Sequence, residues 1–483
     1  MMIINENRML FPFLAKGMEI DLLAGVVRKN KKGNDVHPWL NYRISPQEVR
    51  RELKELNGSC CGRIFSSYRL DKNCYGLYSL DCSGAFMIPH NKLDNIAFSI
   101  LDISVHSFET GIAFLELKYR INSDNEQDAL NFNYYLSELK ANIELCLLRS
   151  QWNEEKREKE SVTEVITVTN LLKRLLDDFG GVTDIDFDGN MKSYSSKPVL
   201  FSYLLLDNPD EDIVKHLGLN MKSSYKINND VLTQTKCFDN STWMYSLNST
   251  VNATLMTSDE ITNDFFKTTF IDKVEKLYFY LFLQSLHQRF FLQMCHYKIR
   301  SYNFDLATLD ENKKLIDALS GYSANFNKAR LKYFFDSPSS IDHVNTFYAA
   351  MRDSLGIQDH VASITADLKV MMTYVDQKYK LFDEYSKLVS DKKQNRLDLI
   401  AFFVASIISF VSIYDTFLKM LSNFGVTLTP DIHILLAVIF MLVCFVIPTA
   451  INFYYNLKKI KRINKKISEL DELICNDQSS SIL

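Results

Sequence analysis

The chain has 483 residues and a formal net charge of −4 at pH 7. This near balance excludes general nucleic-acid affinity, which needs an excess of basic side chains facing phosphates. The length leaves room for two or three soluble units besides a membrane part. The nine cysteines form no CxxC pair, so we interpret them as buried thiols and predict no metal site.

Residues 1–152 are predicted to form a β-rich α+β domain. Apolar and charged residues alternate through Ile112–Ile121, which is typical of a strand in a sheet with one solvent-facing side. Ala97–Val105 is the expected partner strand. Leucines and an isoleucine recur at helical spacing further on and predict a helix over Leu130–Trp152. The charged run Glu154–Glu160 then serves as a connector or solvated helix face.

Residues 153–258 are predicted to form a second α+β segment. Pro198–Leu206 has the composition of a buried strand, and a polar β-meander is expected around Trp243 and Tyr245. Asp184–Gly189 matches the first half of a calcium loop. Its twelfth position is Ser195 instead of the bidentate Glu, so we interpret the run as an acidic turn.

Residues 259–355 are predicted to be helical. Leu277–Leu286 is strongly apolar, but ten residues are too few to cross a bilayer, so a buried helix is expected. Leu306–Asp317 and Ala324–Phe335 are predicted as two further helices. His287 and its neighbours on the same helix lack metal-ligand spacing and are interpreted as packing residues. Gly356 marks a break before the next helix.

A stalk helix is predicted over residues 356–396. Apolar side chains occupy eight of nine positions at heptad spacing, which is the pattern of a coiled coil or helical bundle. These positions are Val361, Ile364, Leu368, Met371, Val375, Lys378, Phe382, Tyr385 and Val389. The stalk runs directly into apolar sequence, which predicts oligomerisation, because one hairpin cannot enclose a pore.

Residues 397–455 are predicted to form a transmembrane hairpin, followed by a basic tail over 456–483. Leu399–Tyr414 and Ile432–Tyr455 contain no charged residue. Lysines and arginines lie before the first segment and after the second, whereas the connecting loop Ser422–Asp431 has none. The bias of positive charge toward the cytosol therefore predicts two spans of the cell membrane with both termini cytoplasmic.

One face of the first span is polar. Its residues follow each other at alternating steps of four and three: Asp398, Phe402, Ala405, Ser409, Ser412, Thr416, Lys419 and Asn423. Such a face is expected to meet protein or water instead of lipid. Helix packing and pore lining both remain open, and the charges at both ends favour pore lining.

This architecture resembles the CorA superfamily, whose members are homopentamers with a pore lined by the first span. The resemblance covers about residues 340–466. Magnesium transporters of that family carry Gly-Met-Asn at the end of the first span, where this chain has Leu421-Ser422-Asn423-Phe424-Gly425. The segment His106–Leu115 and the domain order are similar to the CorA-like effectors found beside type III CRISPR systems. That similarity implies gating by a conjugate of S-adenosylmethionine and AMP.

Three hypotheses follow for an α+β cytosolic region joined to a helical stalk and a CorA-like hairpin. The first is an oligomeric membrane channel that a cytosolic nucleotide opens in antiviral defence, with the ligand-binding residues unknown. The second is a divalent-cation transporter of the Mg²⁺ type, and the third is a membrane-anchored scaffold. No phosphate-binding loop, GxGxxG, HExxH or GxSxG motif occurs, so no enzyme and no resident cofactor are predicted.

Overall fold

The computed structural model describes residues 1–14, 28–29, 35–36, 39–42, 65–70, 83–87, 96–137, 144–153, 158–167, 197–227, 233–302, 309–339, 341–423 and 430–480. These residues fall into two compact units. We call Met1–Ser301 with Asn325–Ala366 the sheet unit. Tyr302–Ala324 with Asp367–Leu483 is the helical unit.

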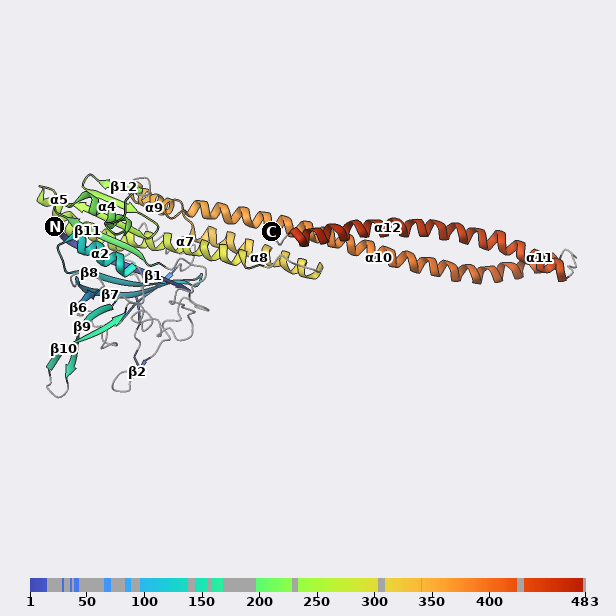
Figure 1. Cartoon of the computed structure of the whole chain (residues 1–483), viewed down its shortest axis with the longest axis horizontal. Helices are drawn as coiled ribbons and strands as arrows, with labels where there is room; N and C mark the ends of the chain where they lie inside the picture. Colours follow the sequence, from blue (N-terminus) through green and yellow to red (C-terminus); the bar gives the residue numbers. More distant parts are fainter. Residues whose placement is uncertain are drawn as a thin grey trace. The chain divides into compact units, whose positions relative to one another are not determined.

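The sheet unit is built on one large sheet (Figure 1), to which twelve of the described strands belong. They are β1 (Met2–Leu14), β4 (Trp39–Tyr42), β5 (Phe65–Leu70), β6 (Ser83–Met87), β7 (Ile96–Phe108), β8 (Ile112–Ile121), β9 (Glu144–Asn153), β10 (Glu158–Thr167), β11 (Val199–Leu206), β12 (Thr233–Phe238), β13 (Ser241–Tyr245) and β14 (Ser249–Leu255). The main order is β10-β9-β6-β7-β8-β1-β11-β14-β13-β12, and β5 pairs with β4 and β7. Strands β2 (Arg28–Lys29) and β3 (Asp35–Val36) form a separate pair. Strands from both sides of residue 152, where the sequence predicted a domain boundary, belong to this one sheet, and its last strand along the chain ends at Leu255.

The predicted strand Ile112–Ile121 is confirmed with the same bounds, and its expected partner is β7. Gly111 closes the turn between them with φ 83°, and its N–H donates to the carbonyl oxygen of Phe108 at 3.0 Å. Glycine adopts this backbone conformation without steric cost. The predicted buried strand and the β-meander are confirmed as β11 and as β12–β14.

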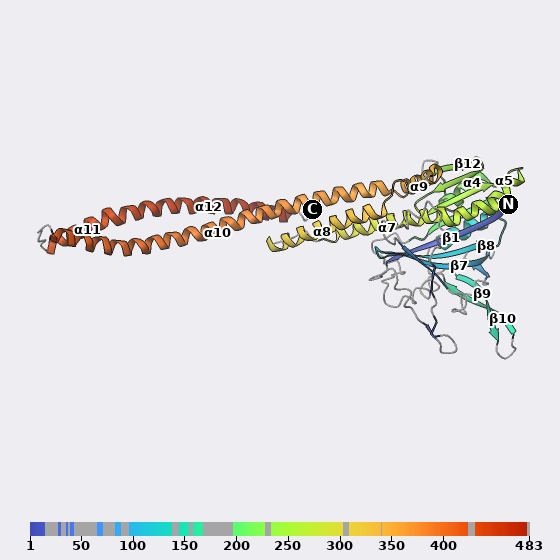
Figure 2. The same ribbon diagram turned by 180° about the vertical axis from the view of Figure 1, so that it is seen from behind.

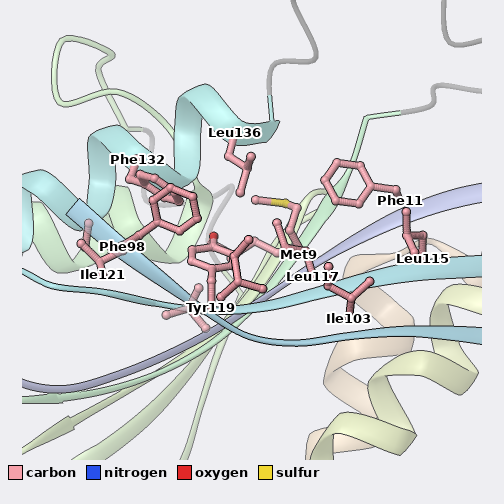
Figure 3. Packing of buried hydrophobic residues seen from close by; sticks show 14 of the residues in the cluster. Met9, Phe11, Phe98, Ile103, Leu115, Leu117, Tyr119, Ile121, Phe132 and Leu136 are labelled. Carbon is pink, nitrogen blue, oxygen red and sulfur yellow. The ribbon is translucent and has the colours of Figure 1, made fainter. Parts of the chain in front are cut away.

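Helices cover both faces of this sheet. Helix α2 (Glu126–Ser137) packs on one face, where Phe132 and Leu136 meet the side chains of β1, β7 and β8 (Figure 3). Helix α4 (Glu211–Leu219) contributes Leu217 to the same core. On the other face, Phe201 of β11 packs its ring 5.0 Å from that of Phe282 on α7. The alternation of side chains along a strand gives each face its own core.

The helices on the second face belong to one long run with two π-helical segments. In chain order they are α5 (Glu260–Phe265), η4 (Phe266–Phe270), α6 (Ile271–Lys273), η5 (Val274–Tyr278) and α7 (Phe279–Arg300). After α8 (Leu309–Tyr333), α9 (Asp342–Ser354) packs Phe347 against Trp243 of β13 at 4.6 Å. The predicted buried helix over Leu277–Leu286 is confirmed.

Two sequence predictions about helices are wrong. The helix predicted over Leu130–Trp152 corresponds to α2 at its start, but Glu144–Asn153 is strand β9, and Glu158–Glu160 of the charged run lies in β10. Apolar residues recur at helical spacing in Glu144–Asn153, but this segment forms a strand because it pairs with β6 on one side and β10 on the other. The two helices predicted over 306–317 and 324–335 are one helix, α8. The predicted helix at Leu171–Phe179 and the acidic turn at Asp184–Gly189 lie outside the described residues.

The helical unit contains most of α10 (Ile357–Asn423), followed by α11 (Pro430–Met441), η6 (Leu442–Val446) and α12 (Ile447–Ser480). Figures 1 and 2 show α12 running back beside α10, and Lys459 Nζ donates to Asn395 Oδ1 at 2.7 Å. Segment η6 ends two residues before Pro448. Proline has no N–H to continue the helical bonding, and a local π turn accommodates this loss.

Among the described residues, one helix is long and apolar enough to cross a membrane. It is α10 over Ile357–Met420, whose most apolar window has a mean hydropathy of 2.2. The second predicted span runs through α11, η6 and the start of α12, and its membrane crossing stays a prediction. Gly356, with φ 63°, separates α9 from α10, which confirms the predicted break.

Candidate functional site

All eight residues of the predicted polar stripe lie on α10. Each of their side chains is exposed in the single chain, from Asp398 at one end to Asn423 at the other. The hydroxyl of Thr416 donates to the carbonyl oxygen of Ser412 at 2.8 Å, and Lys419 pairs with Asp415 at 2.7 Å. These contacts are internal to the helix.

The stripe does not face α12. On the side of α10 that meets α12, Asn395 is buried, and Leu399, Ser406 and Phe417 are half-buried. At 100° per residue, the mean direction of the stripe lies roughly 90° away from this contact side. Packing within the chain therefore leaves the polar face of α10 uncovered.

The stalk positions of α10 differ in burial along its length. Val361, Ile364, Leu368 and Val375 are at most 7% exposed, whereas Val389 is 42% exposed. The heptad pattern is thus filled by the described chain at its beginning and left open toward the apolar segment.

A buried charge network lies between the sheet and α7. Arg8 Nη1 donates to Glu116 Oε1 at 2.8 Å, and Glu116 Oε2 lies 2.8 Å from His106 Nε2. The guanidinium of Arg8 also lies 4.1 Å from the ring centroid of Phe279 on α7. Glu116 is only 4% exposed, so the solvent-facing side predicted for β8 is wrong at this position. Its carboxylate contacts Arg8 and His106, and both of these pack against Phe279 of α7.

Serine, histidine and glutamate are the residue types of a catalytic triad, but here a substrate could not reach the serine. Ser67 Oγ lies 2.7 Å from His106 Nδ1, and Ser67 and His106 are each at most 4% exposed. Burial by itself raises the pKa of Glu116, but Arg8 and His106 outweigh it and lower that pKa to about 2. The carboxylate is therefore charged at physiological pH, and the network links the sheet to α7.

His287 on α7 is also buried and packed, as predicted. Its ring stacks on Phe108 at 4.0 Å, and its Nε2 lies 2.9 Å from Thr110 Oγ1. Burial lowers the pKa of His287 to about 3, so the ring is neutral at physiological pH. Among the described residues, no three His, Cys, Asp or Glu side chains come together in a geometry that could hold a metal ion.

A pocket of about 600 Å³ opens in the sheet unit, at the ends of several elements. Tyr134 comes from α2, Asn220 from the end of α4, and Tyr245 from the end of β13. Tyr225 and Ser354, the last residue of α9, also line it. The sequence did not predict the ligand-binding residues, because the walls of this pocket come from segments up to 220 residues apart that carry no shared motif.

Comparison of the chain with protein-family models, curated proteins and solved structures found no match.

Proposed function

We propose that this protein is a CorA-like oligomeric membrane channel that opens when its cytosolic part binds a nucleotide second messenger. By the resemblance of its sequence, the messenger is a conjugate of S-adenosylmethionine and AMP, and the channel acts in type III CRISPR antiviral defence. The observation that carries the proposal is α10, a 67-residue helix with an apolar segment and an uncovered polar face.

Hydroxyl, carboxylate, ammonium and amide groups along a membrane helix are costly to expose to lipid. Contact with α12 does not relieve this cost, because the stripe lies to one side of that contact. A ring of α10 helices, five in a CorA-like homopentamer, relieves it by turning the stripes inward around water. Both termini then lie in the cytoplasm, with α11 and the start of α12 as the second span.

Gating requires that the cytosolic part move α10. The helix starts at Ile357, directly after the left-handed Gly356, and the same helix carries the stripe. A tilt or twist at its start is therefore carried along one rigid element, as in known helix-coupled switches.

Replacing Ser409 and Ser412 with Leu tests the stripe. We expect flux through liposomes containing the purified protein and the S-adenosylmethionine–AMP conjugate to fall at least about 10-fold, because two hydroxyls of the pore become apolar. The matched control is Val404→Leu with Val411→Leu outside the stripe on α10, where both side chains are exposed and apolar. Undiminished flux in the Ser→Leu variant, with its oligomer intact, would contradict the pore assignment.

A further inference from the structure

One side of α12 carries a row of basic side chains where the helix leaves its apolar segment. The row follows the i, i+3, i+4, i+7, i+8 spacing of one helix face, and every member is exposed: Lys458, Lys461, Arg462, Lys465 and Lys466. We call this row the basic face. Ile463 and Leu470, each 8% exposed, lie roughly 120° away around the helix, at 100° per residue. The basic face therefore points away from the packed side of α12.

The charges of the basic face repel one another. Lys458 and Arg462 are four residues apart, as are Lys461 and Lys465, and like charges at this spacing destabilise a helix. Within the described part of the chain, Lys465 pairs with Glu469 at 3.7 Å, and no carboxylate lies within ion-pair distance of the other four. An anion from outside the chain would relieve this repulsion.

Helix α10 adds positive charge at the same level. Lys459 Nζ donates to Asn395 Oδ1 at 2.7 Å, so the two helices are aligned at these residues. The neighbouring basic residues of α10 are Lys392, Lys393 and Arg396. Exposed apolar and aromatic side chains follow directly on both helices, with Leu397 at 52% and Tyr455 at 65% exposure. Basic residues next to a tyrosine and an apolar surface are typical of the membrane–water interface.

The other end of the apolar segments lacks this charge. The connection 422–431 contains no lysine or arginine, and Lys419 pairs with Asp415 at 2.7 Å. A rise of 1.5 Å per residue places Lys458 to Arg462 roughly 4–10 Å beyond Tyr455 along the axis, within about one Debye length of the interface. Lys465 and Lys466 lie farther, at roughly 15–17 Å. The strongest attraction for anions is therefore at one interface, beside the first three residues of the row.

We propose that the basic face binds the phosphate headgroups of anionic lipids in the cytoplasmic leaflet, with Lys458, Lys461 and Arg462 making most of the binding. The inference rests on the proposed function, because it takes α10 and the second span to cross the membrane. Basic residues close to a bilayer surface attract anionic phospholipids. The guanidinium of Arg462 can in addition donate two parallel hydrogen bonds to one phosphate.

Electron paramagnetic resonance of spin-labelled lipids tests this in phosphatidylcholine bilayers that contain the full-length protein. The quantity measured is the association of phosphatidylglycerol relative to phosphatidylcholine. We expect the wild type to prefer phosphatidylglycerol by about 3-fold at low salt. Combined Lys458→Gln, Lys461→Gln and Arg462→Gln should abolish the preference. Lys465→Gln with Lys466→Gln should keep most of it, because these charges lie farther from the interface.

The matched control removes two lysines and one arginine from exposed positions of α8, as Lys313→Gln, Lys328→Gln and Arg330→Gln. Its lipid preference should equal that of the wild type. A wild type without the preference, or a triple variant of α12 that retains it, would overturn the lipid site. Glycerol 3-phosphate, added at constant ionic strength, should leave the preference unchanged. Loss of the preference on this addition would identify a site for free phosphate instead.

Extraction of the bilayers with alkaline carbonate separates this inference from the proposed function. Release of the wild type by carbonate would contradict the membrane crossing and therefore the channel. A firmly inserted protein without lipid preference would overturn the lipid site alone. A lipid preference that follows these variants in a protein without flux would support the basic face and contradict the channel.

Discussion

At the residue scale, Glu116 shows how one buried charge joins two layers of the fold. Its carboxylate accepts from Arg8 and lies within hydrogen-bond distance of His106, while Arg8 covers Phe279 of α7. Removing one member of such a buried group leaves the others desolvated and unpaired, which costs more than the pair itself contributes.

We therefore expect Glu116→Gln to lower the free energy of unfolding by about 3 kcal/mol at pH 7. Its folded pKa of about 2 lies below the ordinary value of 4.5. The wild-type contribution is thus fully present above pH 4.5 and is lost as the pH falls toward 2. Urea unfolding in mild detergent, followed by tryptophan fluorescence, measures the difference at each pH.

The control for this variant is Glu260→Gln, which removes an exposed carboxylate. Its unfolding free energy should stay within about 0.5 kcal/mol of the wild type. A Glu116→Gln protein as stable as the wild type at pH 7 would show that the network does not hold α7 to the sheet.

The sequence predicted which residues of β8 share a face, but not what covers that face. Alternation along Ile112–Ile121 places Glu116 and Lys118 together, and surface exposure is the usual fate of such residues. Their partners Arg8 and Glu275 lie about one hundred or more residues away along the chain. No local pattern connects such residues, so the buried network could not be predicted.

At the element scale, α4 approaches β13 at a glycine. A Cβ on Gly218 would lie 2.6 Å from Sδ and 2.9 Å from Cβ of Met244. The side-chain sulfur can move, but the Cβ of a strand residue moves only with its backbone.

Gly218→Ala is therefore expected to destabilise the protein by about 1–3 kcal/mol through overpacking. Gly321→Ala is the control, because Gly321 lies inside α8 and a Cβ there meets nothing within 4 Å. That variant should stabilise by about 0.5–1 kcal/mol, since alanine favours helix interiors. Thermal unfolding should show a lower midpoint than the wild type for Gly218→Ala and a higher one for Gly321→Ala. Equal stability of the two variants would mean that α4 and β13 do not pack this closely.

Helices and strands could be predicted from the sequence where apolar residues recur at a regular spacing and a nearby residue marks the end of the element. The heptads of α10, the break at Gly356 and the strand β8 were all found in this way. Strand β9 was not, because its helical spacing competes with pairing to β6 and β10, and the strand β6 is distant in the sequence. Pairing with strands that are distant in the sequence decides whether such a segment forms a strand or a helix. The spacing of its apolar residues carries no information about that pairing.

At the scale of the whole molecule, the sequence predicted the long helix better than the sheet. Hydropathy and charge bias are local properties, and they mark the apolar part of α10 and its polar stripe directly. The pocket depends on Tyr134, Asn220 and Ser354 meeting at the edge of a large sheet. Only the folded chain brings these residues together.

We propose that α10 lines a pore that the bound ligand opens. Ion flux from liposomes that contain the purified protein, measured before and after addition of the S-adenosylmethionine–AMP conjugate, tests it most directly. We expect closed vesicles without nucleotide and rapid flux with it, with no such response to Mg²⁺. Magnesium uptake without any nucleotide response would instead identify a transporter, and vesicles that stay sealed under every condition would contradict the channel and favour a membrane-anchored scaffold.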